Sequence, residues 1–455
     1  MGPHTLAIHA SIFTVNMRRD DNTTFRNETS RPISMNHLFT NHCRDIPLRT
    51  PRLGVKLFWF TLAAAILLIG PSLKVLFAAQ SVAQRVDEKS ALLKLLSLDK
   101  SGEITWETAE GKSPSSSLEK LVQWGEWKEP GRGSIVWLSG GGWFVGELLA
   151  LDSEHLTLDS DLFGEMKLPL ELLAGCTPHP PSDRTERDAL GRKMLQSSGK
   201  TDRVMLDNGD ELTGKIMALK TNKLEIRTAN GPLTLELAKA SSFIFNPALA
   251  ADTRPKGMCV WSSFQDGSRL RLSQLQVDDK KVHANLLGGF EVAADAKSLV
   301  ALQPVGGTVT YLSDVKPDSF KHVPYLQLPW TYEVDHNVLG GQLRCDGRAF
   351  LKGLGMHSAA RVTYALDQKY RRFESEIGID DATRGKGSVV FRVFTDDGSG
   401  TWRDQFTSPV VRGGQSPLPI SVDLWGVKRL SLLVEFADHG DELDHADWLN
   451  ARFVK

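Results

Sequence analysis

Three short stretches near the end of the chain gather residue types that chemistry and ligand binding require. The bend GLGMH ends in His357, whose imidazole can donate or accept a hydrogen bond near neutral pH. The strand GIDD ends in Asp380 and Asp381, whose carboxylates either hold a calcium ion or cap a turn. The segment DHADW adds His445 and Asp447, and we assign Asp447 to the same calcium site. His357 either contacts a ligand or makes structural hydrogen bonds.

Two tryptophans in loops are candidates for an exposed aromatic platform. Trp402 lies in the glycine-rich turn DDGSGTWRD beside Arg403, and Trp425 precedes Gly426 after the strand PISVDL. An aromatic ring flanked by polar side chains suits a ligand with one apolar face and several hydroxyls. The alternative is that both rings cover the ends of a sandwich. Trp448, just before the last strand, is expected in the core.

The elements that position these residues are short strands. From about residue 305, alternating apolar residues recur in RVTYAL, RRFESEIGI, SVVFRVFTD, LPISVDL and RLSLLVEF, separated by glycine and aspartate turns. This spacing predicts an all-β sandwich of about 150 residues.

The same region resembles the NPCBM family, carbohydrate-binding modules related to family 51 and found with family 98 glycoside hydrolases. The motifs that carry the resemblance are YLSD, KGLGMHSAARVTYAL, YRRFESEIGIDD, GSVVFRVFTDDG, VDLWGVKRLSLLVE and DHADWLNARF. The resemblance covers residues 305–455. It implies a jelly-roll sandwich of the galactose-binding type, sugar binding through loops at one end, and in some relatives a structural calcium. Trp425 departs from the family, which usually has a small residue there.

The middle of the chain repeats itself. Residues 136–158 align without a gap to residues 204–226, so the offset is constant, and Gly141 and Gly209 fall where a hairpin turn is expected. A third, weaker copy begins at Cys259. Each copy reads as a small, strongly bent five-strand unit, separate from its neighbours, that weakly resembles the first half of Sm-like barrels. Charged, turn-rich linkers are expected at 177–201 and 246–257.

One apolar run, LFWFTLAAAILLIGPSL over residues 57–73, follows several arginines and lysines. It predicts either a secretory signal cleaved near Ala79 or Ala83, or a single membrane anchor over residues 57–79. Residues 84–455 are therefore expected outside the cytoplasm, in the periplasm, in the cell envelope or secreted. Residues 86–99, VDEKSALLKLLSLD, suggest a short amphipathic helix.

We therefore expect the following organisation: an extension that is disordered or untranslated at 1–50, a targeting segment at 51–83, a linker with a short helix at 84–130, β repeats at 131–177, 200–247 and 257–304, and the sandwich at 305–455.

Composition narrows the function further. The chain has 54 Lys plus Arg against 55 Asp plus Glu, so no broad basic field attracts nucleic acid. Its four cysteines have no metal-ligand spacing. Glycosidases need two carboxylates several ångströms apart in a cleft, and the repeats leave no room for a large catalytic barrel.

Our interpretation is a non-catalytic protein that binds carbohydrate, with galactose-containing glycans as the expected ligand. We assign binding to Trp402, Trp425, His357, Arg403 and His445, and expect no cofactor beyond the calcium. The alternatives are an envelope assembly protein whose sandwich binds protein, and a glycosidase or its accessory protein.

Overall fold

The computed structural model describes residues 80–112, 115–325, 328–366 and 369–455, all of which belong to one compact unit. The expected N-terminal extension and the apolar run lie outside these ranges. No helix within them has the length and apolar character needed to cross a membrane.

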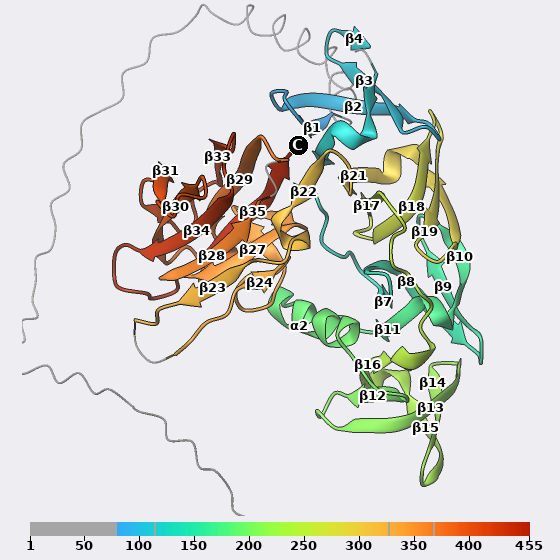
Figure 1. Cartoon of the computed structure of the whole chain (residues 1–455). Helices are drawn as coiled ribbons and strands as arrows, with labels where there is room; N and C mark the ends of the chain where they lie inside the picture. Colours follow the sequence, from blue (N-terminus) through green and yellow to red (C-terminus); the bar gives the residue numbers. More distant parts are fainter. Residues whose placement is uncertain (1–79, 113–114, 326–327, 367–368) are drawn as a thin grey trace, which may run out of the picture. The chain divides into compact units, whose positions relative to one another are not determined.

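Residues 81–305 form four consecutive β units with a common strand plan, among the residues described (Figure 1). In each unit the strands are antiparallel and most pair with their neighbours in the chain, and the last strand, which follows a short 3₁₀ turn, returns to pair with the first. The first unit comprises β1 (Ser81–Arg85), β2 (Ala91–Leu98), β3 (Glu103–Thr108), β4 (Gly111–Lys112), β5 (Ser116–Ser117), η1 (Leu118–Lys120) and β6 (Leu121–Gly125). The second comprises β7 (Ser134–Leu138), β8 (Gly142–Leu151), β9 (His155–Ser160), β10 (Gly164–Pro169), η2 (Leu170–Leu172) and β11 (Leu173–Thr177).

The third unit comprises β12 (Asp202–Leu206), β13 (Glu211–Lys220), β14 (Lys223–Thr228), β15 (Gly231–Glu236), η3 (Leu237–Lys239) and β16 (Ala240–Ile244). The fourth, after η4 (Pro247–Leu249), comprises β17 (Cys259–Phe264), β18 (Arg269–Val277), β19 (Lys281–Leu286), β20 (Glu291–Asp295), η5 (Ala296–Ser298) and β21 (Leu299–Val305). The all-β prediction is confirmed, whereas the resemblance of these units to Sm-like barrels stays a prediction.

The repeated glycines have the same role in both aligned copies. Gly141 and Gly209 each have a φ of +89°, a conformation that a side chain disfavours in a tight turn. At Gly146 and Gly214 a β-carbon would lie 2.4 Å from a carbonyl oxygen of the neighbouring strand. The constant offset therefore records two backbone requirements, a turn and a close strand crossing.

The units are not separate, contrary to expectation. One hydrophobic core contains buried residues from all four of them. Strand β6 of the first unit pairs with β21 of the fourth, and β11 of the second pairs with β16 of the third. Strand β8 also pairs with β18, which links the second and fourth units. Edge strands that would be exposed in isolated units are thereby covered.

The helix expected at 86–99 is wrong, because β2 occupies most of this stretch. Leu93 and Leu98 are both buried although they are five residues apart, an odd spacing that places them on opposite faces of a regular strand. A register shift between Leu95 and Ser97 brings both to the core. This irregularity gives the leucines a helix-like spacing.

The N-terminal boundary also moves. Ala83 lies inside β1 and is fully buried, so the first unit includes residues that we had assigned to the targeting segment.

The linker expected at 177–201 contains helix α2 (Arg184–Leu195). Asp183 is its N-cap, and its carboxylate accepts a hydrogen bond from the backbone N–H of Glu186 at 3.0 Å. Gly191 packs against the ring of Trp137, where a β-carbon would lie 2.2 to 2.8 Å from three ring atoms. The helix is thus fixed on the second unit.

The C-terminal part is a sandwich of two antiparallel sheets. The first sheet has the order β24-β27-β35-β29-β33, with β22 also paired to β35, and the second has the order β23-β28-β34-β30-β31, with β32 paired to β30 (Figure 1). The first contains β22 (Val309–Tyr311), β24 (Glu333–Val334), β27 (Gly353–His357), β29 (Arg372–Ile379), β33 (Leu418–Asp423) and β35 (His445–Val454). The second contains β23 (Ser319–His322), β28 (Ala360–Ala365), β30 (Ser388–Asp396), β31 (Arg403–Thr407), β32 (Val411–Arg412) and β34 (Arg429–Phe436). Also present are η6 (Leu312–Asp314), η7 (Asp381–Thr383) and the hairpin β25 (Leu343–Cys345) with β26 (Arg348–Phe350).

The sandwich core includes Trp448, which is fully buried as expected and meets Phe391 edge to face with ring centroids 5.0 Å apart.

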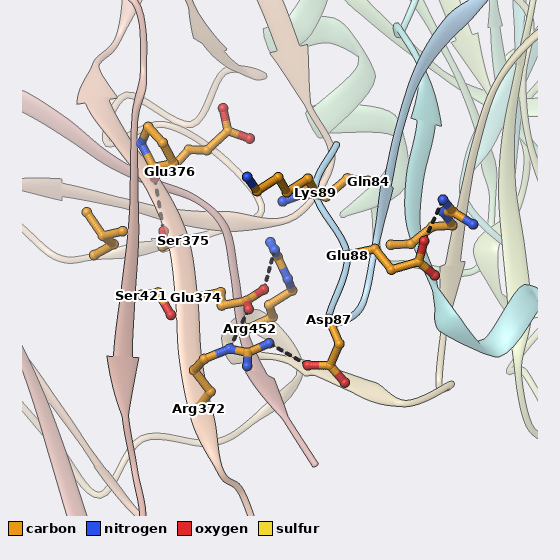
Figure 2. Close-up of a pocket in the computed structure, with 13 residues that line it drawn as sticks. Gln84, Asp87, Glu88, Lys89, Arg372, Glu374, Ser375, Glu376, Ser421 and Arg452 are labelled. Carbon is orange, nitrogen blue, oxygen red and sulfur yellow. Dashed lines mark hydrogen bonds and ion pairs between the residues drawn. The ribbon is translucent and has the colours of Figure 1, made fainter. Parts of the chain in front are cut away.

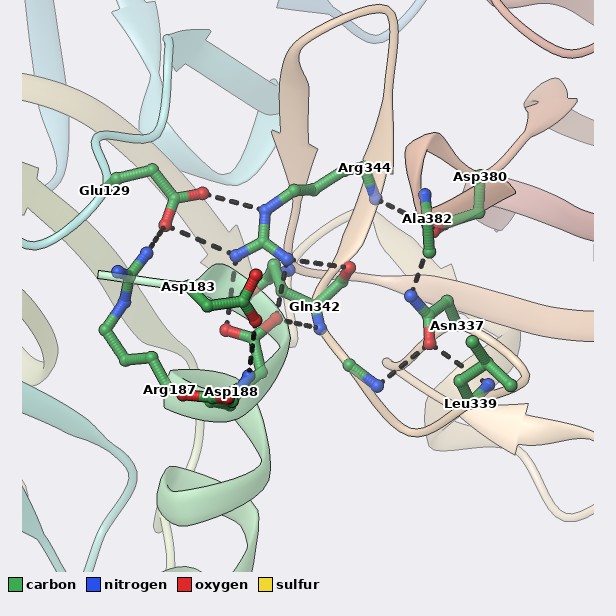
Figure 3. Close-up of polar contacts among 12 residues, drawn as sticks. Glu129, Asp183, Arg187, Asp188, Asn337, Leu339, Gln342, Arg344, Asp380 and Ala382 are labelled. Atoms are coloured by element: carbon green, nitrogen blue, oxygen red, sulfur yellow. Dashed lines mark hydrogen bonds and ion pairs between the residues drawn. The ribbon is translucent and has the colours of Figure 1, made fainter. Parts of the chain in front are cut away.

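Largely buried ion pairs join the sandwich to the β units and to α2 (Figure 3). Arg344 contacts the carboxylate of Glu129 at 2.8 Å and that of Asp188 at 2.6 Å, and only 10% of its side chain is exposed. Arg187 contacts Glu129 from the other side at 2.7 Å. Burial raises the pKa of Glu129, but the two arginines outweigh it and lower that pKa to about 2.

Candidate functional site

Two of the predicted residues, His357 and His445, meet at one end of the sandwich. His357 ends β27 and His445 begins β35, and the two residues are register partners across these strands. Their ring centroids are 5.9 Å apart. Both residues are buried.

Trp330, which the sequence did not single out, completes this cluster. Its indole stacks on the imidazole of His357, with centroids 4.7 Å apart and planes parallel to within 1°. The backbone N–H of Trp330 donates to Nδ1 of His322, the last residue of β23, at 3.1 Å. We call Trp330, His322, His357 and His445 the histidine–tryptophan cluster.

The cluster has unused hydrogen-bonding capacity. Nε2 of His322, Nδ1 of His357 and Nδ1 of His445 are buried and have no hydrogen-bond partner within the described part of the chain. Burial lowers the pKa of His357, and burial together with His357 lowers the pKa of His445 to about 4. Both rings are therefore neutral at pH 7. A neutral imidazole offers one donor and one acceptor, which suits hydroxyl groups.

Exposed apolar side chains form the rim of this end. Tyr325 is 60% exposed and Phe436 is 45% exposed, and their ring centroids lie 5.8 Å apart. Val323 and Leu328 are also exposed, and the backbone of Val323 bonds to that of Ala359, next to the end of β27. The rim thus adds aromatic and aliphatic surface beside the histidine–tryptophan cluster.

An acidic group lies next to His445. Asp444 is fully buried, and its Oδ1 accepts a hydrogen bond from the backbone N–H of Ser388 at 2.9 Å. Burial raises the pKa of Asp444 to about 6, so at neutral pH it is mostly a carboxylate that can accept further hydrogen bonds.

Trp402, Arg403 and Trp425 lie at the opposite end of the sandwich, so the five predicted binding residues do not form one site. In β28, Ala360 pairs with His322, at the end of the sandwich that contains His357. Ala365, at the other end of the same strand, pairs with Arg429. These two positions are separated by roughly 17 Å along the strand. The sequence could not show this, because the ends that two distant loops share depend on strand pairing.

At that opposite end the two tryptophans differ in environment. Trp402 is partly exposed and lies under the guanidinium of Arg429, 4.9 Å from ring centroid to Cζ. Arg403 pairs with Asp397 at 2.9 Å. Trp425 is 88% exposed and has its ring in solvent. Their assignment to a binding site stays a prediction.

The carboxylates assigned to calcium are engaged by protein donors. Asp380 accepts from the side chain of Asn337 and the backbone N–H groups of Arg344 and Ala382 (Figure 3). Asp381 accepts from the backbone N–H groups of Asp346 and Gly347. These contacts are turn chemistry, the alternative considered from the sequence.

Asp447 is fully buried beside Asp380, and burial with that neighbour raises its pKa well above the usual range. Among the described residues no group of three or more His, Cys, Asp or Glu side chains is arranged to hold a metal ion. The calcium stays a prediction.

The C-terminal part of the chain is thus a two-sheet β-sandwich with a polar and aromatic cluster at one end. Residues 308–454 match the family model of the NPCBM/NEW2 domain, and this part of the chain is such a domain. The resemblance inferred from the sequence motifs is therefore confirmed.

Two curated relatives match part of the chain. The "Putative endo-alpha-N-acetylgalactosaminidase" of Renibacterium salmoninarum is 36% identical over 115 residues, which are 25% of this chain and 7% of the relative. The "Alpha-1,3-galactosidase B" of Akkermansia muciniphila is 30% identical over 121 residues, 26% of this chain and 14% of the relative. The chain thus spans only a small part of each.

A solved structure, the CBM51 from Clostridium perfringens GH95 in complex with methyl-galactose, is 22% identical, covers 32% of this chain and 100% of its own, and has a TM-score of 0.29.

Proposed function

We propose that the sandwich binds the terminal sugar of a neutral glycan at the histidine–tryptophan cluster and its rim. The observation that carries this proposal is the set of buried imidazole nitrogens without partners beside an indole. A buried polar atom without a partner costs free energy, and a bound hydroxyl group removes that cost.

The chemistry of a sugar fits both parts of this end. Pyranose rings present C–H groups on one face, which pack against aromatic surface such as that of Tyr325 and Phe436. Their hydroxyls both donate and accept, as the neutral imidazoles of His357 and His445 require. Because the rings are neutral, the cluster favours uncharged sugars over anionic ones.

We infer that the sugar is galactose or N-acetylgalactosamine, since the names of both curated relatives concern glycans of these two sugars. The NPCBM/NEW2 domain supports binding without catalysis as the role of residues 308–454. We also propose that the chain acts outside the cytoplasm, delivered or anchored by the apolar run at 57–73, because glycans of this kind are found there.

The test is calorimetric titration of the full chain with methyl galactoside and with methyl N-acetylgalactosaminide. Trp330→Ala should weaken binding roughly tenfold or more, since it removes both an aromatic contact and the stack that orients His357. Trp402→Ala and Trp425→Ala, at the opposite end, are matched controls and should leave the affinity unchanged.

The reverse pattern would contradict the assignment. Unchanged affinity in a folded Trp330→Ala protein, with loss in Trp425→Ala or Trp402→Ala, moves the site to the other end. Absence of binding to both sugars and to a wider glycan array contradicts carbohydrate binding itself.

A further inference from the structure

A polar cleft lies between the first β unit and the outer face of the first sheet of the sandwich (Figure 2). Its volume is about 480 Å³. One wall is the turn between β1 and β2, from which Asp87 and Lys89 reach toward the sandwich. The other wall consists of β29, which contributes Arg372 and Glu374, β35, which contributes Arg452, and β33.

Ion pairs hold the two walls in place. Asp87 contacts Arg371 and, at 2.9 Å, Arg372. Glu374 lies between two guanidinium groups, 2.6 Å from that of Arg372 and 2.6 Å from that of Arg452. These paired side chains are therefore fixed before any ligand arrives, which lowers the entropy lost on binding.

The lining carries no net charge. It contains four basic residues and four acidic ones, which are Arg85, Lys89, Arg372 and Arg452 against Asp87, Glu88, Glu374 and Glu376. This balance disfavours phosphate or a polyanion, which would meet the carboxylates. Two apolar residues, Pro419 and Ile420, also line the cleft, but the side chain of Ile420 is buried in the sandwich core. The cleft therefore disfavours an apolar ligand as well.

Some donors in the cleft are unused. Nε of Arg452 is buried and has no hydrogen-bond partner in the described part of the chain, and only 3% of that side chain is exposed. Nε of Arg85 is likewise buried and has no hydrogen-bond partner among the described residues. Lys89 makes no hydrogen bond or ion pair with any described residue. Of these three donors, that of Lys89 belongs to an exposed residue, so a ligand for this cleft should supply an acceptor to Lys89 and also donate to the fixed carboxylates.

We propose that this cleft is a second carbohydrate site that takes a neutral, hydroxyl-rich saccharide unit. Vicinal hydroxyls accept from a guanidinium and donate to the neighbouring carboxylate, which matches the alternation of Arg372, Glu374 and Arg452. The sandwich alone does not complete the site, because one wall belongs to the first β unit. The site shares the ligand class of the proposed function but uses different residues at a different place.

The probe is di-N-acetyllactosamine, a neutral tetrasaccharide ending in galactose, titrated into the full chain by calorimetry. The wild type should bind two molecules per chain. Ser421→Trp places a bulky ring in the cleft and should remove one of the two binding events. Lys89→Ala, whose side chain has no structural partner, should weaken that same event roughly tenfold. Lys100→Ala, an exposed lysine at the β2–β3 turn, is the matched control and should change neither.

The two sites fail in distinguishable ways. If the chain binds one tetrasaccharide, Trp330→Ala abolishes this binding and the cleft variants leave it unchanged, the cleft proposal is overturned and the proposed function stands. If Trp330→Ala changes nothing and the cleft variants abolish binding, the cleft is supported and the loop-end site is wrong. Two events that both resist the cleft variants, or no binding at all, also overturn the cleft.

Discussion

Replacing Arg344 by alanine should loosen the sandwich from the β units. Its guanidinium lies between the carboxylates of Glu129 and Asp188, and removing it leaves two largely buried carboxylates with fewer partners. Folding lowers the pKa of Glu129 from its ordinary value of 4.5 to about 2, and this difference corresponds to roughly 3 kcal/mol of stabilisation at neutral pH. Arg187 shares this effect, but the loss of the Asp188 contact adds to the cost. We therefore expect a loss of about 3 kcal/mol.

Amide hydrogen exchange measures this loss locally. Helix α2 carries Asp188, so a loss of about 3 kcal/mol should raise the exchange rates of its amides roughly a hundredfold in Arg344→Ala. Arg344→Lys keeps the charge but not the planar guanidinium, so its α2 exchange rates should lie between those of the wild type and those of Arg344→Ala. Arg348→Ala is the control, because Arg348 is 43% exposed and its pair with Glu376 at 3.2 Å lies outside this network.

Equal α2 exchange in the Arg344→Ala and Arg348→Ala proteins would refute the argument. The sign of the pH effect is a second check. Because the pKa of Glu129 is lowered on folding, its contribution is complete above about pH 4.5 and disappears as the pH falls toward about 2.

Two further changes test the interior. Asp447→Asn should flatten the dependence of the melting temperature on pH. Burial and Asp380 raise the pKa of Asp447, so the wild type loses stability as the pH rises through that pKa. The amide of the variant does not titrate and so lacks this loss. Identical melting curves for both proteins from pH 4 to 9 would argue against a protonated Asp447. Gly191→Ala should destabilise the protein by about 1 to 3 kcal/mol, since the new methyl group would overlap the ring of Trp137. Ala189→Ser, on the exposed side of α2, is the control and should leave the stability unchanged. An unchanged melting temperature in Gly191→Ala would show that the helix shifts freely.

Strand content was predictable where one face alternates without interruption. The glycines and apolar positions of the second and third units follow a regular period, and their strands lie where the pattern predicts. The first unit was misread as a helix because leucine fills most of the apolar positions of Ala91–Leu98; its register shift between Leu95 and Ser97 has counterparts in β8, β13 and β18. Helix α2 had a detectable signal in Asp183 and Glu186, three residues apart at its start, which the charged composition of the linker concealed.

The candidate site was only half predictable. His357 and His445 are next to strand ends that the alternation identifies, so their residue types pointed to them. Trp330 lies in a loop without periodicity, and its stack on His357 depends on how β23 pairs with β28. Which loops share an end of the sandwich is a property of strand order, and sequence spacing carries little information about that order.

The pairing of β22 with β35 has a mechanical consequence. Val309 pairs with Val454, which in turn pairs with Arg372, so the chain enters the sandwich at the end opposite to His357 and His445. A pull between those histidines and the preceding chain therefore acts along the strands. Antiparallel hydrogen bonds lie perpendicular to the strands, so such a load shears the three pairs of β22 together instead of opening them one after another. Tension in this direction is therefore carried by all three pairs at once.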